Sequence, residues 1–470
     1  MRVLTTVGVI VTALLAAAAG TTSAVGAGAG ASLAAISTGA STGAYYRVDP
    51  SRILDTRQGF GGARLGPGAV LGLQVGGKGG VPTAGVAAVV LNVTVTNPTS
   101  GSYLTTYPSD VARPNTSSIN FPTGFTGANL VTVPLHTGGV VDLYNAFGSV
   151  DVIADVVGFY AAKETLVPTL GASGGFIATT PTRLYDSRTD LSAGSAPFVN
   201  GEFVTIPVRL GPDANGVDVT DKIRAMVVNV TVASPSAGGF VRTWDGAAAE
   251  PATSTVNFAA GNNVANTTIV PTAACTVCGG SPDPSFQLKV YTSGSAQVIV
   301  DIVGVTLDAT YTADWRFKPL AAPQRIVDTR LSLGISRLGE AQPQTFVVPS
   351  PVAGPNTMAI VANLTAVSPT APTYLQLWAA GDPVPDVSNL NLGTGQVVAN
   401  AAYVPVGANN NITIQNRYGQ TDVIVDVAGT MEYVAPAAAP KTPALASGAQ
   451  TARPPHAVSP VPAPAATSGR

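Results

Sequence analysis

A six-residue motif occurs three times in this 470-residue chain, and its spacing sets the scale of any fold the chain can adopt. The pattern is Arg, two apolar residues, Asp, Thr or Ser, and Arg, and it begins at Arg52, Arg183 and Arg325. The copies lie roughly 130 to 140 residues apart, which is the length of a domain and far longer than a solenoid repeat. The sequence therefore predicts one module that is copied three times.

Each predicted module is built from short apolar runs between turn-forming residues. Only 11% of residues are charged, and 51 Gly and 37 Pro break up the runs of Val, Ile, Leu and Ala. No segment shows a convincing helical period, so the pattern favours short antiparallel strands. We expect an all-β fold of three tandem antiparallel β-sandwich, jelly-roll-like modules, each about 120 to 140 residues long. In the first module the strands are expected at 70–75, 86–96, 103–107, 118–121, 130–135, 140–144 and 150–160.

Recurring markers fix the limits of the modules. An Asn within an apolar strand, a second Asn after Ala, and an Asp within the last strand return in the same order each time. The predicted modules span 45–162, 174–309 and 315–433. The markers are Asn92, Asn129 and Asp155, then Asn229, Asn266 and Asp301, then Asn363, Asn400 and Asp426.

The two ends of the chain differ from the modules in composition. Residues 1–24 have the apolar run and small-residue end of an export signal, and 25–44 have the composition of a Gly/Ala/Ser linker. Residues 434–470 are rich in Pro and Ala and predict a disordered tail. No transmembrane anchor is expected beyond the signal segment. The protein is therefore expected to be secreted, either free outside the cell or associated with the cell wall.

Charge excludes some functions. The formal net charge is −2 and no Lys/Arg cluster occurs, so neither nucleic-acid binding nor attachment to an anionic membrane is expected. No motif for a cofactor appears, and none is predicted.

The charged residues of the motif allow two interpretations. An Asp with two nearby Arg could form a recognition cluster for carboxylates or sugar hydroxyls, or an internal salt bridge. We favour the salt bridge. Strand alternation would place Asp55 and Arg57 on one face and Arg52 on the other. The three sets are Arg52, Asp55 and Arg57, then Arg183, Asp186 and Arg188, then Arg325, Asp328 and Arg330.

A second Asp lies between apolar residues in the last strand of each module. Asp155, Asp301 and Asp426 need a partner if they are buried, because an unpaired buried carboxylate is costly. The motif Arg is the partner we expect, and this pair would join the first and last segments of a module. The alternative is a catalytic acid, since glycoside hydrolysis uses two carboxylates and each module has two.

Two aromatic residues recur four positions apart on one short strand, so they share a face. If that face is exposed, it could stack sugar rings; if it is buried, it belongs to the core, which we favour. The pairs are Tyr103 and Tyr107, Phe240 and Trp244, and Tyr374 and Trp378.

The remaining candidates occur in the second module only. Cys275 and Cys278 are the two cysteines of the chain, and a local disulfide is the favoured interpretation. A metal site is not predicted, because two Cys and two distant His are too few ligands for zinc. A weak calcium candidate consists of Asp213, Asn215, Asp218 and Asp221.

The motifs together resemble a repeat found in secreted proteins of high-GC Gram-positive bacteria. They are Arg-Ile-Leu-Asp-Thr-Arg from Arg52, Asn-Val-Thr-Val-Thr from Asn92, Asn-Phe from Asn120, and Asp-Val-Ile-Ala-Asp-Val-Val-Gly-Phe-Tyr from Asp151. The resemblance covers about residues 45–433, and modules two and three depart from it at Val305 and Thr430. It implies an exported β-domain without known catalytic residues, and a role in surface or wall attachment.

The expected function is that of a non-catalytic structural or binding protein at the cell surface. Its partner would be a cell-wall or other extracellular polysaccharide, bound at several sites, or a surface protein. One alternative is an extracellular glycan hydrolase that uses the paired Asp residues. Another is an architectural spacer or assembly subunit.

Overall fold

The computed structural model describes residues 43–162, 174–189, 198–212, 216, 218–275, 286–308, 311 and 315–434, with the backbone of 460–461 and 467–469. The predicted signal segment, and the predicted linker up to residue 42, lie outside these residues. Within them the fold is all-β, and the antiparallel sandwich prediction is confirmed. The only helical segments of the described chain are short 3-10 turns. They are η1 (Thr56–Gln58), η2 (Thr220–Lys222), η3 (Thr329–Leu331) and η4 (Ala408–Asn410).

The first predicted module contains two four-stranded sheets. One has the order β1-β8-β3-β6 and the other β2-β7-β4-β5. This alternation of strands between two antiparallel sheets is the jelly-roll topology. The strands are β1 (Tyr45–Asp55), β2 (Val70–Gln74), β3 (Val86–Thr96), β4 (Ser102–Pro108), β5 (Ile119–Phe121), β6 (Gly127–Pro134), β7 (Val140–Asn145) and β8 (Asp151–Ala161).

The same strand order returns in the rest of the chain. In the second module β9-β17-β11-β14 faces β10-β16-β12-β13, and in the third β18-β25-β20-β23 faces β19-β24-β21-β22. The sheets β14-β11-β17-β9 and β18-β25-β20-β23 join into one eight-stranded sheet, because Trp315 of β18 pairs with Phe176 of β9. The second module has β9 (Phe176–Asp186), β10 (Glu202–Leu210), β11 (Ile223–Ala233), β12 (Gly239–Trp244), β13 (Val256–Phe258), β14 (Val264–Pro271), β15 (Ala273–Ala274), β16 (Phe286–Thr292) and β17 (Gln297–Leu307). The third has β18 (Trp315–Asp328), β19 (Gln344–Val347), β20 (Thr357–Val367), β21 (Thr373–Ala379), β22 (Leu390–Leu392), β23 (Val397–Pro405), β24 (Asn411–Asn416) and β25 (Asp422–Tyr433).

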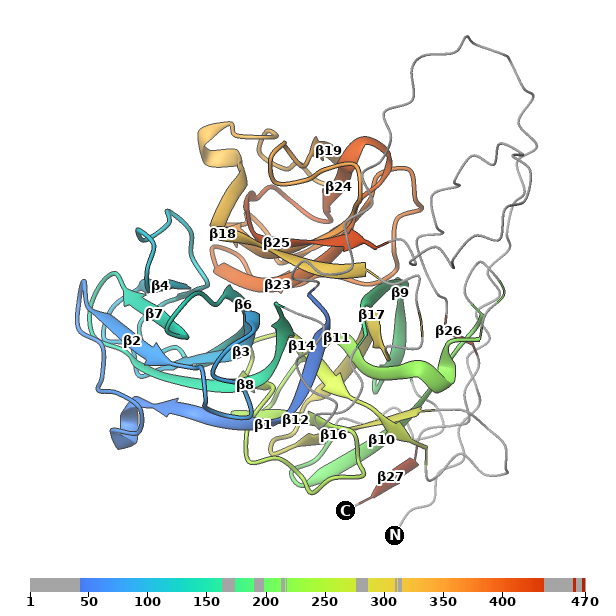
Figure 1. Ribbon diagram of the computed structural model, residues 1–470, viewed down its shortest axis with the longest axis horizontal. Coiled ribbons are helices and arrows are strands. Elements are labelled where there is room, and N and C mark those ends of the chain that lie inside the picture. The colour runs from blue at the N-terminus through green and yellow to red at the C-terminus, as the bar shows by residue number, and fades with distance from the viewer. Residues whose placement is uncertain are drawn as a thin grey trace, which may run out of the picture.

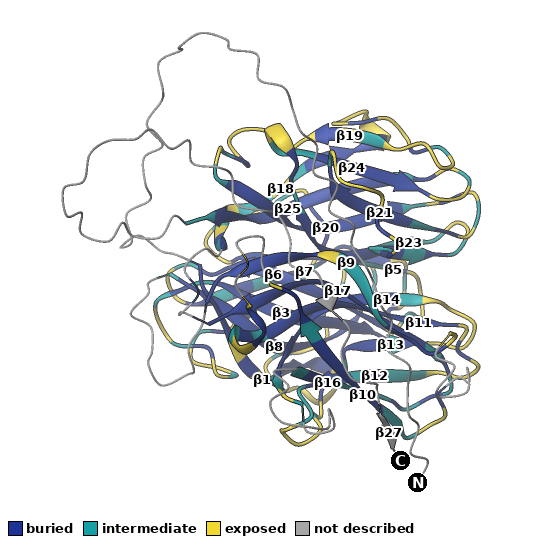
Figure 2. Ribbon diagram, turned by 90° about the vertical axis from the view of Figure 1, so that its right-hand side faces the viewer, coloured by how far each residue is buried: buried dark blue, intermediate teal, exposed yellow. Residues whose placement is uncertain are grey.

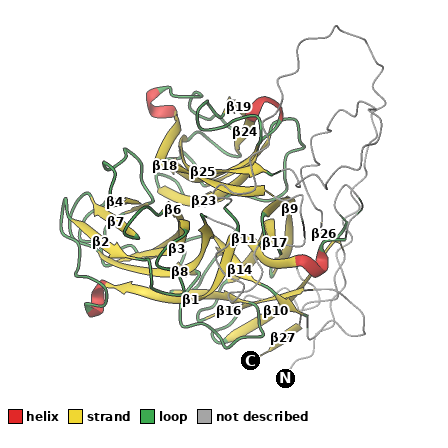
Figure 3. Cartoon of the chain, in the orientation of Figure 1, coloured by secondary structure: helices red, strands yellow, loops and turns green. Residues whose placement is uncertain are grey.

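Each sandwich has its own hydrophobic core, made by the inward side chains of its two sheets. Three clusters of buried residues fall in the ranges 44–161, 177–311 and 326–427. In Figure 1 they appear as three lobes, blue to cyan, green to yellow, and orange to red, and Figure 3 shows that each consists of strands joined by loops.

A fourth core lies where the three lobes meet, and it contains residues of all three. Its aromatic rings cross the boundaries: Tyr160 stacks on Phe317 with centroids 4.4 Å apart, and Phe176 lies 5.7 Å from Tyr403. In Figure 2 buried residues continue through this junction. The three sandwiches are therefore packed on one another through apolar surface, which the sequence did not reveal.

A glycine in the last strand makes room for this central core. An added Cβ on Gly304 would lie 2.3 Å from the ring of Phe176, and one on Gly158 would lie 2.2 Å from the hydroxyl oxygen of Tyr45. Gly429 has the same relation to Phe317, at 2.5 Å. The glycine that follows each strand Asp is thus required for an aromatic side chain of the first strand to lie flat on the sheet.

Part of the C-terminal segment differs from the prediction of a disordered tail. Two short strands, β26 (Pro460–Val461) and β27 (Thr467–Gly469), pair with β10. β10 is an edge strand whose free backbone groups can pair with any extended segment, so this addition needs no apolar side chains. Composition alone could not indicate it.

Among the described residues, no helix is long and apolar enough to cross a membrane.

Candidate functional site

The motif aspartate stands where the first strand turns. Asp55 ends β1 and caps η1, accepting the backbone N–H of Arg57 at 3.2 Å. The guanidinium of Arg57 also binds Asp55, through Nε at 2.9 Å and Nη2 at 2.7 Å. Asp55 is buried, and this network satisfies both of its oxygens. The sequence Asp-Thr-Arg therefore forms a local turn that the ion pair between its Asp and its Arg stabilises.

The first Arg of the motif joins the two ends of the module. Arg52 binds Asp155 of β8 through Nε at 2.9 Å and Nη2 at 3.3 Å, and its Nη1 reaches Asp55 at 3.4 Å. The expected Arg–Asp pairing is thus present, and it recurs in the other modules. The matching bonds run from Arg183 to Asp301 and Asp186, and from Arg325 to Asp426 and Asp328.

One detail of the prediction is wrong. Alternation placed Arg52 on the face opposite Asp55, but Arg52 contacts that carboxylate. The pairing of β1 with β8 shifts register between Arg52 and Leu54, and the strand ends at Asp55 in a turn. Both features break the strict alternation of side chains.

The hydroxyl residue of the motif fixes the start of the last strand. Thr56 donates to Asp151 at 3.1 Å and accepts the N–H of Val152 at 2.9 Å. Ser187 and Thr329 make the same contacts with Gln297 and Val298 and with Asp422 and Val423. Every polar position of the motif is therefore used within its own module.

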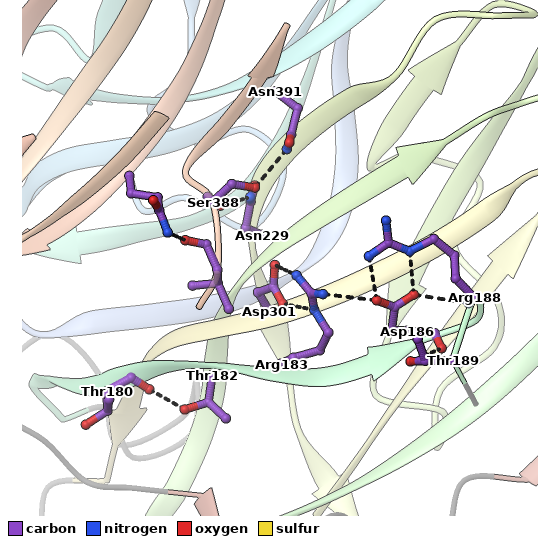
Figure 4. Close-up of polar contacts among 12 residues, drawn as sticks. Thr180, Thr182, Arg183, Asp186, Arg188, Thr189, Asn229, Asp301, Ser388 and Asn391 are labelled. Carbon is purple, nitrogen blue, oxygen red and sulfur yellow. Dashed lines mark hydrogen bonds and ion pairs between the residues drawn. The ribbon is translucent and has the colours of Figure 1, made fainter. Parts of the chain in front are cut away.

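Burial and pairing shift the pKa values of the two aspartates of a module, the strand Asp and the motif Asp, in opposite directions. Burial raises the pKa of Asp301 to about 6 despite the bond from Arg183, and it raises the pKa of Asp155 and Asp426 as well. The hydrogen bonds from Arg57 and Arg330 lower the pKa of Asp55 and Asp328. Figure 4 shows Arg183 between Asp301 and Asp186, with Arg188 on the far side of Asp186.

This geometry does not provide the open cleft that a paired-Asp hydrolase needs. Asp55 and Asp155 were to flank a glycosidic bond in an open cleft. Both are 1% exposed, and Arg52 lies bonded between them. Neither carboxylate is free to donate a proton to a substrate or to attack one.

The strand asparagines form a second recurring site, and they join different modules. Asn92 of β3 donates to the carbonyl of Ser254 at 2.7 Å, and its Oδ1 accepts the amide of Asn266 at 2.9 Å. Asn229 bonds in the same way to Ser388 and Asn400, as Figure 4 shows in part. Asn363 bonds to Ser117 and Asn129. Module one thus contacts two, two contacts three, and three contacts one, so the set closes.

The second Asn of each module caps a neighbouring sheet edge. Asn266 Oδ1 accepts the backbone N–H of Leu130, the third module's Asn400 accepts that of Thr267, and Asn129 accepts that of Ala401. These N–H groups belong to β6, β14 and β23, which end their inner sheets and contact one another at the centre (Figure 1). The asparagine set, named here the asparagine ring, therefore protects three strand edges from solvent.

The role of these residues could not be read from the sequence. Their recurrence was visible, but alternation with apolar residues is typical of a strand with one solvated face. In β3 all residues but one are buried, because the polar face packs on the next module. Recurrent Asn, rather than Ser or Thr alone, was the only signal.

The aromatic strand divides into a buried and an accessible half. Tyr107, Trp244 and Trp378 are 5%, 8% and 6% exposed, so they cannot form a stacking platform. The loop after the strand folds back over this face: Thr105 donates to the carbonyl of Thr116, and Gln376 to that of Pro385. Tyr103, Phe240 and Tyr374 are only partly buried.

Each accessible aromatic belongs to a small surface cluster. Tyr103 lies 6.3 Å from Tyr144 and 6.4 Å from Phe147 between ring centroids. Phe240 lies 6.2 Å from Tyr291, and Tyr374 lies 6.2 Å from Tyr418. Phe147 and Tyr418 are 60% and 46% exposed. We name these groups aromatic clusters one, two and three, after their modules.

Half of the candidate residues of the second module lie outside the described residues. Cys275 is disulfide-bonded, while Cys278, the only other cysteine of the sequence, is not described. Asp213 and Asn215 of the calcium candidate are not described either. Asp218 accepts the N–H of Thr220, and Asp221 contacts Lys222. In the part of the chain that is described, no three acidic, His or Cys residues are grouped to hold a metal.

No protein-family model matches the chain, and a search of curated proteins finds no match. Among solved structures, the chain is similar to one described as "The Triple Jelly Roll Fold and Turret Assembly in an Archaeal Virus". The identity is 13% and the TM-score 0.16, over 83% of this chain and 91% of that chain. A likeness this low carries no argument about function, so a proposed function must rest on the contacts of the chain itself.

Proposed function

We propose that this protein is a secreted, non-catalytic scaffold that binds extracellular polysaccharide through equivalent surfaces on three modules. The observation that carries the proposal is the recurrence of a partly exposed aromatic cluster on the outer sheet of every module. Aromatic rings bind the apolar face of a sugar ring, while their polar groups contact its hydroxyls. Resemblance to repeats of exported bacterial proteins supports the extracellular location.

The recurring charges support a scaffold rather than a catalyst. An Arg of the same module binds each strand Asp, that is Asp155, Asp301 and Asp426. The asparagine ring forms hydrogen bonds between modules. The second Arg of each motif is partly exposed but is paired with the motif Asp, whereas the aromatic surface recurs without such a partner. Three weak sites on one packed body would bind a polymer with avidity if one polymer reaches more than one of them.

Retention on insoluble polysaccharide tests the proposal. The full chain is incubated with purified cell wall, cellulose and chitin, and the bound fraction is measured after washing. We expect retention on at least one of them, and a progressive loss as Tyr103→Ala, Phe240→Ala and Tyr374→Ala are combined. Circular dichroism shows whether the variants remain folded. No retention of the unaltered chain, or full retention of the folded triple variant, would contradict the proposal.

A further inference from the structure

The three aromatic clusters differ in charge. In cluster one the guanidinium carbon of Arg113 lies 3.7 Å from the centroid of Tyr144, and in cluster three Arg417 lies 5.3 Å from Tyr418. Both arginines are exposed. No ion pair or hydrogen bond joins either guanidinium to another described residue, although arginines elsewhere in the chain pair with carboxylates.

Cluster two has the same elements but is already neutralised. Arg242 lies 4.5 Å from the centroid of Phe240 and 5.6 Å from that of Tyr291. Its guanidinium forms an ion pair with Glu250. The arginine of cluster two is therefore neutralised, although Lys289 lies 5.0 Å from the ring centroid of Phe203, which pairs with Tyr291 across the sheet. Cluster two differs from the other two in having its stacked arginine in an ion pair.

A guanidinium beside an aromatic face fits one kind of sugar particularly well. The apolar face of a pyranose ring can lie on an aromatic side chain, and a carboxylate on that ring can then accept hydrogen bonds from Arg. Stacking on Tyr144 also orients the guanidinium of Arg113 and leaves its donors available. The exposed rings of Phe147 and Tyr418 extend the contact area in clusters one and three.

We infer that clusters one and three bind acidic polysaccharide, with a carboxylate-bearing sugar on the aromatic rings and its charge on Arg113 or Arg417. This inference rests on the proposed polysaccharide binding and adds the class of sugar. Cluster two contributes aromatic contacts that do not use the charge of its arginine, because Glu250 holds Arg242.

The test compares polygalacturonate with its fully methyl-esterified form, which has the same backbone without the charge. Binding of the full chain to each immobilised polymer is measured at low and high salt. The variants are Arg113→Gln, Arg417→Gln, their combination, and Lys78→Gln, which matches each single Arg variant in its loss of charge. Lys78 lies in the turn after Val75, and Val75 bonds to Gly139 just before β7 begins. Tyr144 lies near the other end of β7, so Lys78 is away from cluster one.

Polygalacturonate should bind about tenfold more tightly than the ester at low salt, and the preference should shrink at high salt because exposed charges are screened. The double Arg variant should lose most of this preference and each single Arg variant part of it, whereas Lys78→Gln should keep it. Equal binding of both polymers, or an unchanged preference in the double variant, overturns the inference and leaves polysaccharide binding standing. If neither polymer binds, nor any insoluble polysaccharide, the proposed function falls with it.

Discussion

The amide of Asn266 donates to Oδ1 of Asn92 at 2.9 Å. This bond joins two β-sandwiches through residues that are 174 positions apart in the sequence. Both residues are buried, and their remaining polar atoms bond to Ser254, Thr255 and Leu130. Two further copies of the same bond close the asparagine ring. The side-chain amides of the asparagine ring are all satisfied, so they help to specify the central packing of the molecule in addition to its apolar core.

Opening one link of the asparagine ring should destabilise the whole molecule. Asn229→Ala removes the donor to the Ser388 carbonyl and the acceptor of the Asn400 amide, which leaves buried polar groups unsatisfied. We expect a loss of about 2 kcal/mol in the free energy of unfolding, measured by urea denaturation. Asn391→Ala is the control: Asn391 donates only to the Ser388 hydroxyl and is partly exposed, so it should cost about 0.5 kcal/mol. Equal losses for the two variants would mean that the ring adds nothing beyond an ordinary polar contact.

Removal of the motif Arg should cost more than removal of the second Arg. Arg183→Met leaves the buried carboxylate of Asp301 without its partner, and such losses are about 3 to 5 kcal/mol. Arg188 is more exposed and Asp186 keeps Arg183, so Arg188→Met should cost about 1 kcal/mol. Thermal and urea unfolding measure both. In the double variant with Asp301→Asn, much of the loss caused by Arg183→Met should be recovered. A smaller loss for Arg183→Met than for Arg188→Met would contradict this account of the motif.

The fold was predictable because its signals are local. Short apolar runs and turn residues indicated the strands, and β3, expected at 86–96, spans Val86–Thr96. The Arg52–Asp155 pair was predictable because an Asp between apolar residues needs a partner and one Arg recurs with it.

The relations between modules were not predictable. Asn92 has the sequence context of a residue on a solvated strand face, since nothing near it in sequence shows that another sandwich covers that face. The burial of Trp378 depends on a loop that folds back, and spacing along the strand contains no information about it. Tyr144 and Arg113 joined the aromatic cluster through strand pairing and loop closure, which bring together residues far apart in sequence.

The charge pairs predict an unusual dependence of stability on pH. The pKa of Asp301 rises from 3.8 to about 6 on folding, so the folded state binds its proton more tightly than the unfolded state. Its contribution is complete below about pH 4 and is lost as the pH rises to about 6, up to ~3 kcal/mol. Asp155 and Asp426 act in the same sense. The lowered pKa values of Asp55 and Asp328 act oppositely, and their contribution is lost only as the pH falls below about 4.

Urea denaturation from pH 4 to pH 7 measures this effect. The free energy of unfolding should decline across the range, and Asp301→Asn should make the decline shallower, because one titrating group is gone. A rise in stability from pH 4 to pH 6, with no difference between the two proteins, would show that Asp301 titrates as an ordinary exposed carboxyl group does.

A single methyl group at Gly304 should disturb the junction of all three modules. The added Cβ would lie 2.3 Å from the ring of Phe176 and 2.9 Å from the carbonyl oxygen of Ile177, so ring and strand must move apart. Overpacking of this kind costs about 1 to 3 kcal/mol. Phe176 lies 5.9 Å from Trp315, between ring centroids, so the displacement should also change Trp fluorescence. Gly354→Ala is the control, since an added Cβ there meets no atom within 4 Å and should leave stability and fluorescence unchanged. If Gly304→Ala also leaves stability and fluorescence unchanged, the close contact of the aromatic ring with the sheet is not what requires glycine at this position.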